Sequence, residues 1–332
     1  YFVNLVESLS KDERIKPSIV CPIYKNIYLN NVSLNFKKGL FLGKKFPFTG
    51  KLIKLINNIG SNKYYNELKP DIYHQTYYEI VNSKIKCPKF ITVYDLYHEI
   101  FSRDPNFRPK KNSLDKADHI MCISNSTKKD LINLYSINSE KITVAHLGCD
   151  HVKINSKNSE NFAPFLLFVG SRKQYKNFDF FLKSISLSRK ILNDFEIIFY
   201  GGGKFEKEEI KLINELKLPF QKIRNLQGDD DQLYKLYNKA SALVFPSAHE
   251  GFGLPILEAI SKKCPIACSD IEIFREIGQN LVNYFDPNDE ISIKTTIEKT
   301  LDNIHQEKIK IDNNFDQFTK KFTWDNCARK TL

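Results

Sequence analysis

No run of about eighteen consecutive apolar residues occurs in the sequence, so the chain offers no candidate transmembrane helix. A complete G-x-G-x-x-G fingerprint is also missing, which argues against an NAD-dependent oxidoreductase on a dinucleotide-binding fold. The seven cysteines are scattered and show neither the paired C-x2-C spacing nor the histidine partners of a zinc site. Reduced thiols in a cytoplasmic protein are the simplest interpretation of such cysteines.

The chain has 332 residues, of which 42% are hydrophobic and 27% are charged. This length and composition fit a globular protein with two domains of ordinary size. The chain begins at Tyr1, inside a pattern typical of an amphipathic helix, with apolar side chains at Phe2, Leu5, Val6 and Leu9. We therefore expect a preceding strand and loop to lie outside this numbering.

Positive charge is concentrated in the first half of the chain. Residues 1–150 contain 23 Lys and Arg against 14 Asp and Glu, and the stretch from Arg14 to Asn66 contains ten basic residues and no acidic one. Phenylalanines interleave with its lysines, which suits an anionic membrane surface at about 1 kcal/mol for each basic residue near the lipid. The alternative is a solvated loop whose phenylalanines pack inward. No nucleic-acid recognition motif accompanies the charge, so we expect no nucleic-acid partner.

Strand-like and helix-like segments alternate along the chain, a pattern that predicts βαβ units and parallel sheets. The expected strands lie at 71–74, 89–94, 119–123, 141–145, 165–169, 196–200, 222–226 and 242–245. A polar stretch at 151–164 is interpreted as a linker. The sequence thus predicts an α/β fold with two doubly wound, Rossmann-like domains, at 1–150 and 165–315, with ligands at the carboxyl ends of the strands.

The most informative segment is the turn that follows the strand at 242–245. Residues 245–260 read F-P-S-A-H-E-G-F-G-L-P-I-L-E-A-I. Gly251 and Gly253 allow the backbone to approach a ligand closely, and Pro255 suits the first position of a helix. The free N–H groups at that helix start, together with the helix dipole, favour an anion such as a phosphate.

Two carboxylates flank this turn. Glu258 lies about one turn into the helix, where side chains lean back toward the N-terminus, so we expect it to reach hydroxyls of a ligand at the helix start. Glu250 lies on the loop, on the other side of that ligand. A nucleotide sugar has the phosphates and hydroxyls that such a site would bind. The alternative is a strand–turn–helix unit with a surface glutamate and an unrelated salt bridge.

The segment resembles the signature of the retaining glycosyltransferases of family 4, mannosyltransferase-like group 1 enzymes with the GT-B fold. Their mark is two glutamates, separated by seven residues, around G-F-G-L-P, and it is matched at Glu250, Gly251, Phe252, Gly253, Leu254, Pro255 and Glu258. The resemblance implies that Glu250 contacts the donor sugar, that Glu258 holds the ribose hydroxyls, and that backbone N–H groups near 252–254 assist. It also implies a final helix, within 316–332, that crosses back to the first domain.

A basic loop, S-R-K-Q-Y-K-N, follows the strand at 165–169. Cations on a strand–helix loop suit a diphosphate, whose departure builds negative charge. The family has an arginine and a lysine here. Lys176 and Asn177 match in position, whereas Arg172 comes one place later than in the commonest version. Either Arg172 or Lys173 is therefore the second expected contact to the diphosphate, and a solvated basic loop is the alternative.

The stretch T-V-Y-D-L-Y-H-E is similar to an acceptor-side stretch of the family, T-V-H-D-x-x-H-E. Asp95, His98 and Glu99 match it, and Tyr94 replaces the commoner histidine. A histidine or an aspartate at the carboxyl end of a strand could orient the acceptor hydroxyl or take its proton. His74, in H-Q-T-Y-Y, resembles a second acceptor-side loop. A structural role is the alternative for both histidines.

The run D-D-D at 229–231 invites comparison with the metal-binding D-x-D motif of other glycosyltransferases. The run precedes an amphipathic helix, where aspartate is a preferred cap and suits the helix dipole, so we interpret it as a cap. The resemblance implies that neither a metal ion nor another cofactor is needed.

The sequence therefore predicts a retaining, metal-independent hexosyltransferase that moves a sugar from a nucleotide diphosphate sugar to a hydroxyl of a glycan or lipid-linked saccharide, in the synthesis of a surface polysaccharide such as lipopolysaccharide. GDP-mannose-like and UDP-sugar donors both occur in the family, and the S-R-K-x-Y-K-N loop favours the former. We expect a cytoplasmic location, with peripheral contact to the inner face of the membrane through residues 14–66. The alternative is a catalytically inactive GT-B protein that binds a polyanion or a membrane surface.

Overall fold

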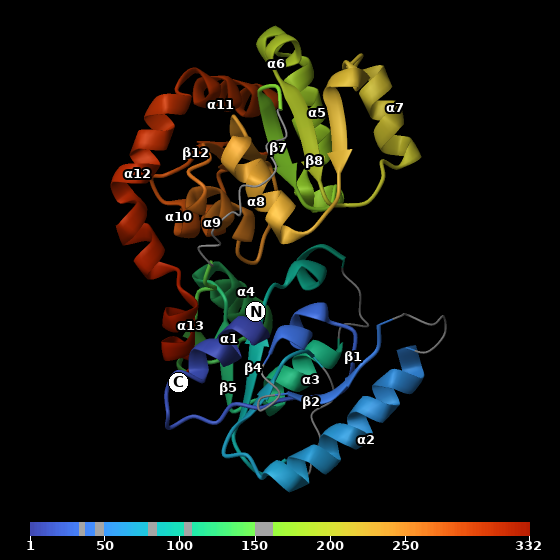
Figure 1. The fold of residues 1–332 in the computed structure, drawn as a ribbon, viewed down its shortest axis with the longest axis vertical. Helices are drawn as coiled ribbons and strands as arrows, with labels where there is room; N and C mark the ends of the chain where they lie inside the picture. The colour runs from blue at the N-terminus through green and yellow to red at the C-terminus, as the bar shows by residue number, and fades with distance from the viewer. Residues whose placement is uncertain (33–36, 44–49, 79–84, 103–107, 150–161) are drawn as a thin grey trace. The chain divides into compact units, whose positions relative to one another are not determined.

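The structure is a computed structural model that describes residues 1–32, 37–43, 50–78, 85–102, 108–149 and 162–332. The chain divides into two compact units, which Figure 1 shows as ribbons. Unit 1 consists of Tyr1–Gly148 and Thr323–Leu332, and unit 2 consists of Cys149–Phe322. Most of the expected linker at 151–164 lies outside the described residues.

Unit 2 is built on one parallel sheet of six strands in the order β12-β11-β10-β7-β8-β9. The strands are β7 (Phe165–Val169), β8 (Glu196–Tyr200), β9 (Ile223–Leu226), β10 (Ala242–Phe245), β11 (Ile266–Ser269) and β12 (Asn283–Phe285). The chain adds β8 and β9 on one side of β7 and then adds β10 to β12 on the other. The order therefore reverses between β7 and β10, which is where ligands bind in open parallel sheets.

Helices connect these strands. They are α5 (Phe178–Ser186), α6 (Arg189–Asp194), α7 (Lys207–Glu215), α8 (Asp230–Lys239), α9 (Leu254–Ser261), α10 (Glu272–Gly278), α11 (Glu290–Asp302) and α12 (Ile304–Lys321), with 3-10 turns η5 (Gln174–Lys176) and η6 (Phe220–Lys222). β7 is apolar throughout because every one of its side chains is buried. The ring of Phe168, on this strand, lies 5.3 Å from that of Phe199 and 5.8 Å from that of Phe181.

Unit 1 contains two parallel sheets, β1-β2 and β3-β4-β5-β6. The strands are β1 (Ile19–Tyr24), β2 (Lys37–Phe41), β3 (Tyr73–Gln75), β4 (Lys89–Val93), β5 (His119–Cys122) and β6 (Ile142–Val144). The helices are α1 (Phe2–Leu9), α2 (Gly50–Leu68), α3 (Arg108–Lys116), α4 (Asn125–Tyr135) and α13 (Trp324–Thr331), with short turns η1 (Ile27–Asn31), η2 (His98–Ser102) and η4 (Ser139–Lys141). The predicted α/β class with parallel sheets is confirmed, although β1 and β2 are strands that the sequence pattern did not predict.

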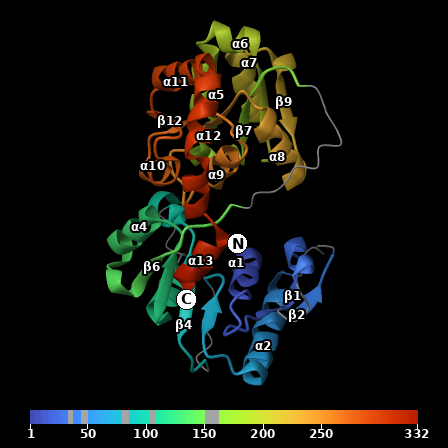
Figure 2. The same ribbon diagram turned by 60° about the vertical axis from the view of Figure 1, so that its left-hand side comes forward.

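The last helix, α13, belongs to unit 1 and packs against α1, as Figures 1 and 2 show. The ring of Trp324 lies 5.8 Å from that of Tyr1. The hydroxyl of Thr323 accepts a hydrogen bond from the N–H of Asn326 at 3.0 Å and so caps the helix. The chain thus rejoins unit 1 at Thr323, whereas the expected boundary at 315 falls inside α12.

Close packing between Gly148 and α13 predicts that even one added methyl group is harmful. A Cβ atom on Gly148 would lie 2.3 Å from the backbone nitrogen of Trp324. We expect Gly148→Ala to lower the free energy of unfolding by about 1–3 kcal/mol, measured by urea titration. Gly50→Ala is the control, because a Cβ atom there meets nothing within 4 Å. An unchanged urea midpoint in Gly148→Ala would contradict this packing.

Candidate active site

The loops that follow β7 and β10 meet at the carboxyl edge of the unit 2 sheet, where the strand order reverses. The N–H of Ala248 donates to the carbonyl of Tyr175 at 2.8 Å. Lys176 forms an ion pair with Glu250, and only 12% and 15% of these two side chains are exposed. The structure therefore brings together two of the residues that the sequence predicts at the site, from loops far apart in the chain.

Aromatic rings surround the ammonium group of Lys176. Its Nζ lies 5.1 Å from the ring centroid of Phe245 and 5.3 Å from that of Tyr175. It also lies 3.8 Å from the position that a Cβ atom of Gly170 would occupy. Ring faces attract a cation, and a largely buried charge is stable only beside a counter-charge. The position of Lys176 is thus fixed by rings and by Glu250 together.

The start of α9 has the geometry that its sequence predicts. Gly253 has a φ of 104° at the cap position, a conformation that favours glycine. A Cβ atom there would also lie 3.1 Å from the ring of Phe274, so the position is restricted by space as well. Pro255 lies in the first turn of the helix. A helix start of this kind favours a bound anion.

The neighbours of Gly253 contribute in different ways. Phe252 is buried, with its ring 6.4 Å from that of Phe322, so its side chain belongs to the core of unit 2 and only its backbone is available to a ligand. Leu254 is exposed and Gly251 is partly exposed. The expected role of residues 251–254, which is to present backbone N–H groups, stays a prediction.

Glu258 lies one turn into α9 and contacts a residue that sequence reasoning missed. Its Oε2 accepts a hydrogen bond from the hydroxyl of Tyr237, on α8, at 2.9 Å. Burial raises the pKa of Glu258, and the charge of Asp230 raises it further, whereas the hydrogen bond from Tyr237 lowers it. Burial also raises the pKa of Tyr237 well above its ordinary value. No signal in the sequence distinguishes Tyr237 from the other apolar positions of α8.

Arg172 is turned into the protein, with 2% of its side chain exposed. Its Nε donates to Glu209 at 2.8 Å, and its Nη atoms donate to the four carbonyls of residues 201–204 at 2.9–3.5 Å. The ring centroid of Phe205 lies 4.8 Å from the guanidinium group. Arg172 therefore holds the glycine loop after β8, and its donors are directed to these protein acceptors, so the diphosphate contact expected of it stays a prediction. Lys173, the alternative contact, is exposed on the same loop.

The acceptor-side candidates follow β4 in unit 1 and divide into two kinds. Asp95 is partly exposed, and its Oδ1 accepts a hydrogen bond from the N–H of Tyr97 at 3.1 Å. His98 is exposed. Glu99 is instead buried in an ion pair with Lys110, with 2.9 Å between the charged atoms. Because that pair satisfies its charge inside the unit, the contact of Glu99 with an acceptor is not supported.

His74 is largely enclosed by unit 1. Its Nε2 is hydrogen-bonded to the hydroxyl of Thr92 at 2.8 Å, and its ring meets that of Phe2 edge-on at 5.5 Å. Desolvation lowers the pKa of His74 to about 4, so the imidazole is neutral near pH 7. These contacts match the structural alternative for His74 rather than an acceptor-binding role.

The run of aspartates caps α8. The Oδ1 of Asp229 accepts a hydrogen bond from the N–H of Gln232 at 3.0 Å, which confirms the capping role. Within the ranges that the structure describes, no three His, Cys, Asp or Glu residues are grouped so that they could hold a metal ion.

Asn177, the other residue of the basic loop that matches the family, donates to the carbonyl of Pro287 at 2.5 Å.

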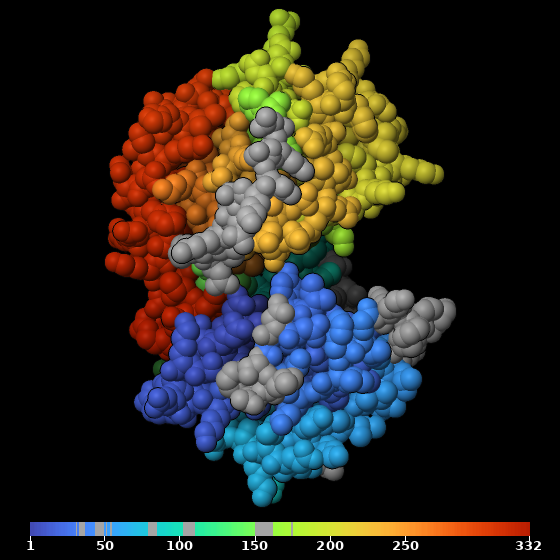
Figure 3. Space-filling model, viewed as in Figure 1, coloured from blue at the N-terminus to red at the C-terminus, as the bar shows by residue number. Residues whose placement is uncertain are grey.

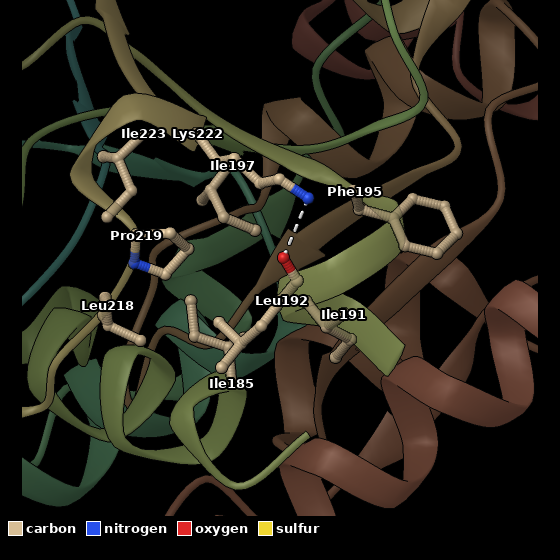
Figure 4. Close-up of a pocket in the computed structure, with 9 residues that line it drawn as sticks. All are labelled: Ile185, Ile191, Leu192, Phe195, Ile197, Leu218, Pro219, Lys222 and Ile223. Carbon is tan, nitrogen blue, oxygen red and sulfur yellow. Dashed lines mark hydrogen bonds between the residues drawn. The ribbon is translucent and has the colours of Figure 1, made fainter. Parts of the chain in front are cut away.

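A small apolar pocket lies at the opposite edge of the unit 2 sheet, where β8 and β9 begin (Figure 4). Ile185, Leu218 and Ile223 line it among others. Lys222 crosses it and donates to the carbonyl of Leu192 at 3.0 Å, near the end of α6. A lysine at a helix C-terminus satisfies carbonyls that the helix leaves unpaired. This pocket is a gap in helix–sheet packing at the amino ends of the strands and offers no chemistry.

The architecture of the two units is that of the GT-B glycosyltransferases. The Anabaena protein HepE, solved in complex with UDP and glucose, has a similar fold, with a TM-score of 0.74 at 15% sequence identity over 99% of this chain and 93% of that chain. The chain belongs to the family described as glycosyl transferases group 1, whose model matches residues 151–321. Residues 1–153 match the model described as glycosyltransferase family 4.

Two relatives are mannosyltransferases by name. The O-antigen chain mannosyltransferase RfbU of Salmonella typhimurium is 30% identical over 247 residues, which are 72% of this chain and 67% of that protein. The O-antigen chain mannosyltransferase B of Escherichia coli is 28% identical over 232 residues, 66% of this chain and 61% of that protein. The resemblance to mannosyltransferase-like group 1 enzymes is confirmed.

Among the described residues, no helix combines the length and the apolar character needed to cross a membrane.

The lowered pKa of His74 predicts a loss of stability in mild acid. The folded value of about 4 lies below the ordinary 6.5, so the unfolded state binds the proton first and stability falls as the pH drops from about 6.5 to 4. In His74→Gln, which does not titrate, the loss of unfolding free energy between pH 7 and pH 5 should be smaller by about 2 kcal/mol than in the wild type. Urea titrations at both pH values measure it, with exposed His98→Gln as the control. Equal losses in His74→Gln and the wild type would exclude a buried neutral imidazole.

Proposed function

We propose that the chain is a retaining, metal-independent hexosyltransferase that uses a nucleotide diphosphate sugar. The acceptor is a hydroxyl of a glycan or a lipid-linked saccharide in surface polysaccharide synthesis. The observation that carries this proposal is the ion pair of Lys176 and Glu250 beside the start of α9, at the strand reversal of unit 2. The names of the two O-antigen mannosyltransferases support the substrate class, and the HepE complex supports a nucleotide donor.

The cations at this edge take up the charge of the leaving diphosphate. Lys176 is largely shielded from water, where electrostatic interactions are stronger than in bulk solvent. The N–H groups at the start of α9 add to its effect, and exposed Lys173 offers a second cation from the same loop. Once the diphosphate engages Lys176, Glu250 is released from its ion pair and accepts hydrogen bonds from the donor sugar.

The transfer itself takes place on one face of the sugar. The bond from the anomeric carbon to the diphosphate breaks, the acceptor oxygen bonds to the same face, and the leaving phosphate takes the acceptor proton, so the anomeric configuration is retained. Glu258 holds the ribose hydroxyls. Asp95 and His98, from unit 1, orient the acceptor hydroxyl. Because Lys176 and the helix start carry the phosphate charge, the reaction requires no metal ion.

The donor is GDP-mannose or a related GDP sugar in this proposal. Both named relatives are mannosyltransferases, and the basic loop of unit 2 resembles that of mannosyltransferase-like enzymes. A UDP sugar is the second candidate, because the solved structure of HepE contains UDP. Thermal-shift measurements with GDP, UDP and their sugars separate the two, since a nucleotide that binds the folded state raises the midpoint.

The proposal predicts a selective loss of activity in Glu250→Gln. The amide keeps the shape of the side chain and can still accept a hydrogen bond from Lys176, but it lacks the charge that balances the lysine and binds the donor sugar. We expect transfer to fall by about a hundredfold or more, as measured by release of the nucleotide diphosphate. The thermal midpoint should fall, because Lys176 loses its counter-charge, so transfer is compared at a temperature well below the midpoint of the variant. Glu215→Gln, an exposed glutamate on α7, is the matched control.

Two outcomes would overturn this assignment. Turnover like that of the wild type in Glu250→Gln would remove Glu250 from the chemistry. A wild-type protein that binds nucleotides in the thermal-shift assay, yet releases no nucleotide diphosphate from any donor, would favour the catalytically inactive binding protein instead.

We further propose that unit 1 contacts the cytoplasmic face of an anionic membrane through α2. One face of α2 packs on β1, where the side chain of Asn57 exchanges two hydrogen bonds with the backbone of Ile23, at 2.7 and 3.0 Å. The other face carries an exposed apolar stripe at helical spacing, with exposed fractions of 39–64%, formed by Leu52, Leu55, Ile56 and Ile59. This helix, light blue in Figure 3, lies at the surface of unit 1.

The charge around α2 suits lipid headgroups. Lys63 lies on this helix with an exposed ammonium group 4.0 Å from the carboxylate of Glu67, and the basic stretch 14–66 contains no acidic residue. An apolar stripe beside basic side chains is the pattern of interfacial helices. Of the phenylalanines that the sequence places in this stretch, Phe41 is exposed at the end of β2, whereas those at 36, 46 and 48 lie outside the described residues.

The membrane proposal predicts that a charge in the apolar stripe of α2 weakens vesicle binding, whereas the same change in unit 2 does not. Ile59→Glu should reduce binding to vesicles of phosphatidylglycerol and phosphatidylcholine by about tenfold in a sedimentation assay, because it places a charge in the apolar stripe. Ile291→Glu is the control, since that isoleucine is exposed to a similar degree, 58% against 64%, but belongs to unit 2. Equal binding by the two variants would show that α2 is not the contact.

A further inference from the structure

We propose that Tyr237 is a positioning residue for the ribose of the donor. Its hydroxyl holds one oxygen of the Glu258 carboxyl group, so that the other oxygen is kept ready to accept a hydrogen bond from a ribose hydroxyl. The inference rests on the proposed function, because it takes a nucleotide as the ligand at the start of α9. It adds a residue on α8, outside the signature turn, to the groups that determine which nucleotides bind.

The geometry places Tyr237 behind Glu258 rather than beside the ligand. Tyr237 is fully buried on α8, and α8 packs against α9. Its hydroxyl donates to Oε2 of Glu258 at 2.9 Å. Glu258, by contrast, is only partly buried as a residue. A side chain fixed in this way is pre-organised for a second hydrogen bond.

The second oxygen of Glu258 can still accept hydrogen bonds. A carboxylate offers about four acceptor sites on two oxygens, and the bond from Tyr237 uses one of them. Among the residues that the structure describes, no other group donates to this carboxyl group. Ribose presents two neighbouring hydroxyls, which are donors of the kind that an unused carboxylate oxygen accepts. The chemistry of the contact therefore specifies a ribonucleotide over one that lacks these hydroxyls.

Tyr237 also favours the charged form of Glu258, which is the better acceptor. Burial and the negative charge of Asp230 both disfavour the carboxylate, and the hydrogen bond from Tyr237 opposes them. The raised pKa of Tyr237 keeps its hydroxyl protonated, so that it donates throughout the physiological range of pH. Without the hydroxyl, the carboxyl group would lose this hydrogen bond, and its pKa would be raised further.

The test is the preference for ribose hydroxyls, measured as the ratio of two dissociation constants. The probes are GDP and 2′,3′-dideoxy-GDP, or the UDP pair if UDP binds more tightly. We expect the wild type to prefer the ribonucleotide by about tenfold or more. Tyr237→Phe keeps the ring and removes only the hydroxyl, so it should reduce this preference at least threefold and leave the affinity for the dideoxy compound unchanged.

A control variant separates this effect from general loosening of unit 2. The Tyr284 hydroxyl donates to the carbonyl of Gln279 at 2.7 Å, away from Glu258, so Tyr284→Phe also removes a hydrogen-bonded hydroxyl. It should leave the preference for ribose at the wild-type value. Glu258→Gln should reduce the preference, and adding Tyr237→Phe to it should cause no further reduction, because the two residues act through one contact.

The possible outcomes separate a failure of the proposed function from a failure of the role proposed for Tyr237. If the wild type binds no nucleotide diphosphate, the proposed function fails. If Glu258→Gln abolishes the ribose preference but Tyr237→Phe retains it in full, the proposed function stands and the role of Tyr237 is wrong. Should Tyr237→Phe not fold, Glu258→Asp replaces it, because the shorter acid cannot reach both Tyr237 and the ribose. A wild-type preference in Glu258→Asp would overturn the inference.

Discussion

The ion pair of Lys176 and Glu250 is the interaction on which the unit 2 site depends. Its members are 74 positions apart in the sequence, and they meet because β7 and β10 are neighbours in the sheet although β8 and β9 intervene in the chain. A largely buried charge is costly without a counter-charge, so each side chain holds the other in place. A nucleotide sugar offers a replacement for both partners, phosphate oxygens for the lysine and hydroxyls for the glutamate. The pair is therefore a form of pre-organisation for such a ligand.

Features that depend on local sequence were predictable. Rules that act over a few residues predict the strand β7, the capping aspartate Asp229 and the helix that begins near Pro255, and all three occur in the structure. The signature turn was informative for the same reason, since Pro255 and the glycines determine how the chain passes from a strand into α9. The boundary expected at 315 lies inside α12, which continues through it without any interruption that composition would reveal.

Roles that depend on distant partners were not predictable. Arg172 matches a diphosphate-binding position approximately, but Glu209 and the carbonyls after β8 hold its guanidinium group. Glu99 matches an acceptor-side position, but Lys110 neutralises it inside unit 1. Neither partner belongs to a motif, and in each case the match covers the residue type without its environment. A sequence reports which side chains are present, whereas the fold decides which of them are already satisfied by other parts of the protein.

Hydrogen-bond satisfaction therefore separates structural polar groups from candidates for ligand binding. Buried polar groups need partners, and a group that has found all of them inside the protein gains nothing from a ligand. By that criterion Arg172 and Glu99 have structural partners, whereas the side chains of Lys176 and Glu250 share one hydrogen bond, and among the described residues neither forms a second. Glu258 is different, because Tyr237 satisfies one of its oxygens and no described residue donates to the other. Such a half-satisfied carboxyl group, held rigidly one turn into α9, is stable without a ligand and still able to bind one. Selection for a nucleotide would retain both its buried partner and its unused oxygen.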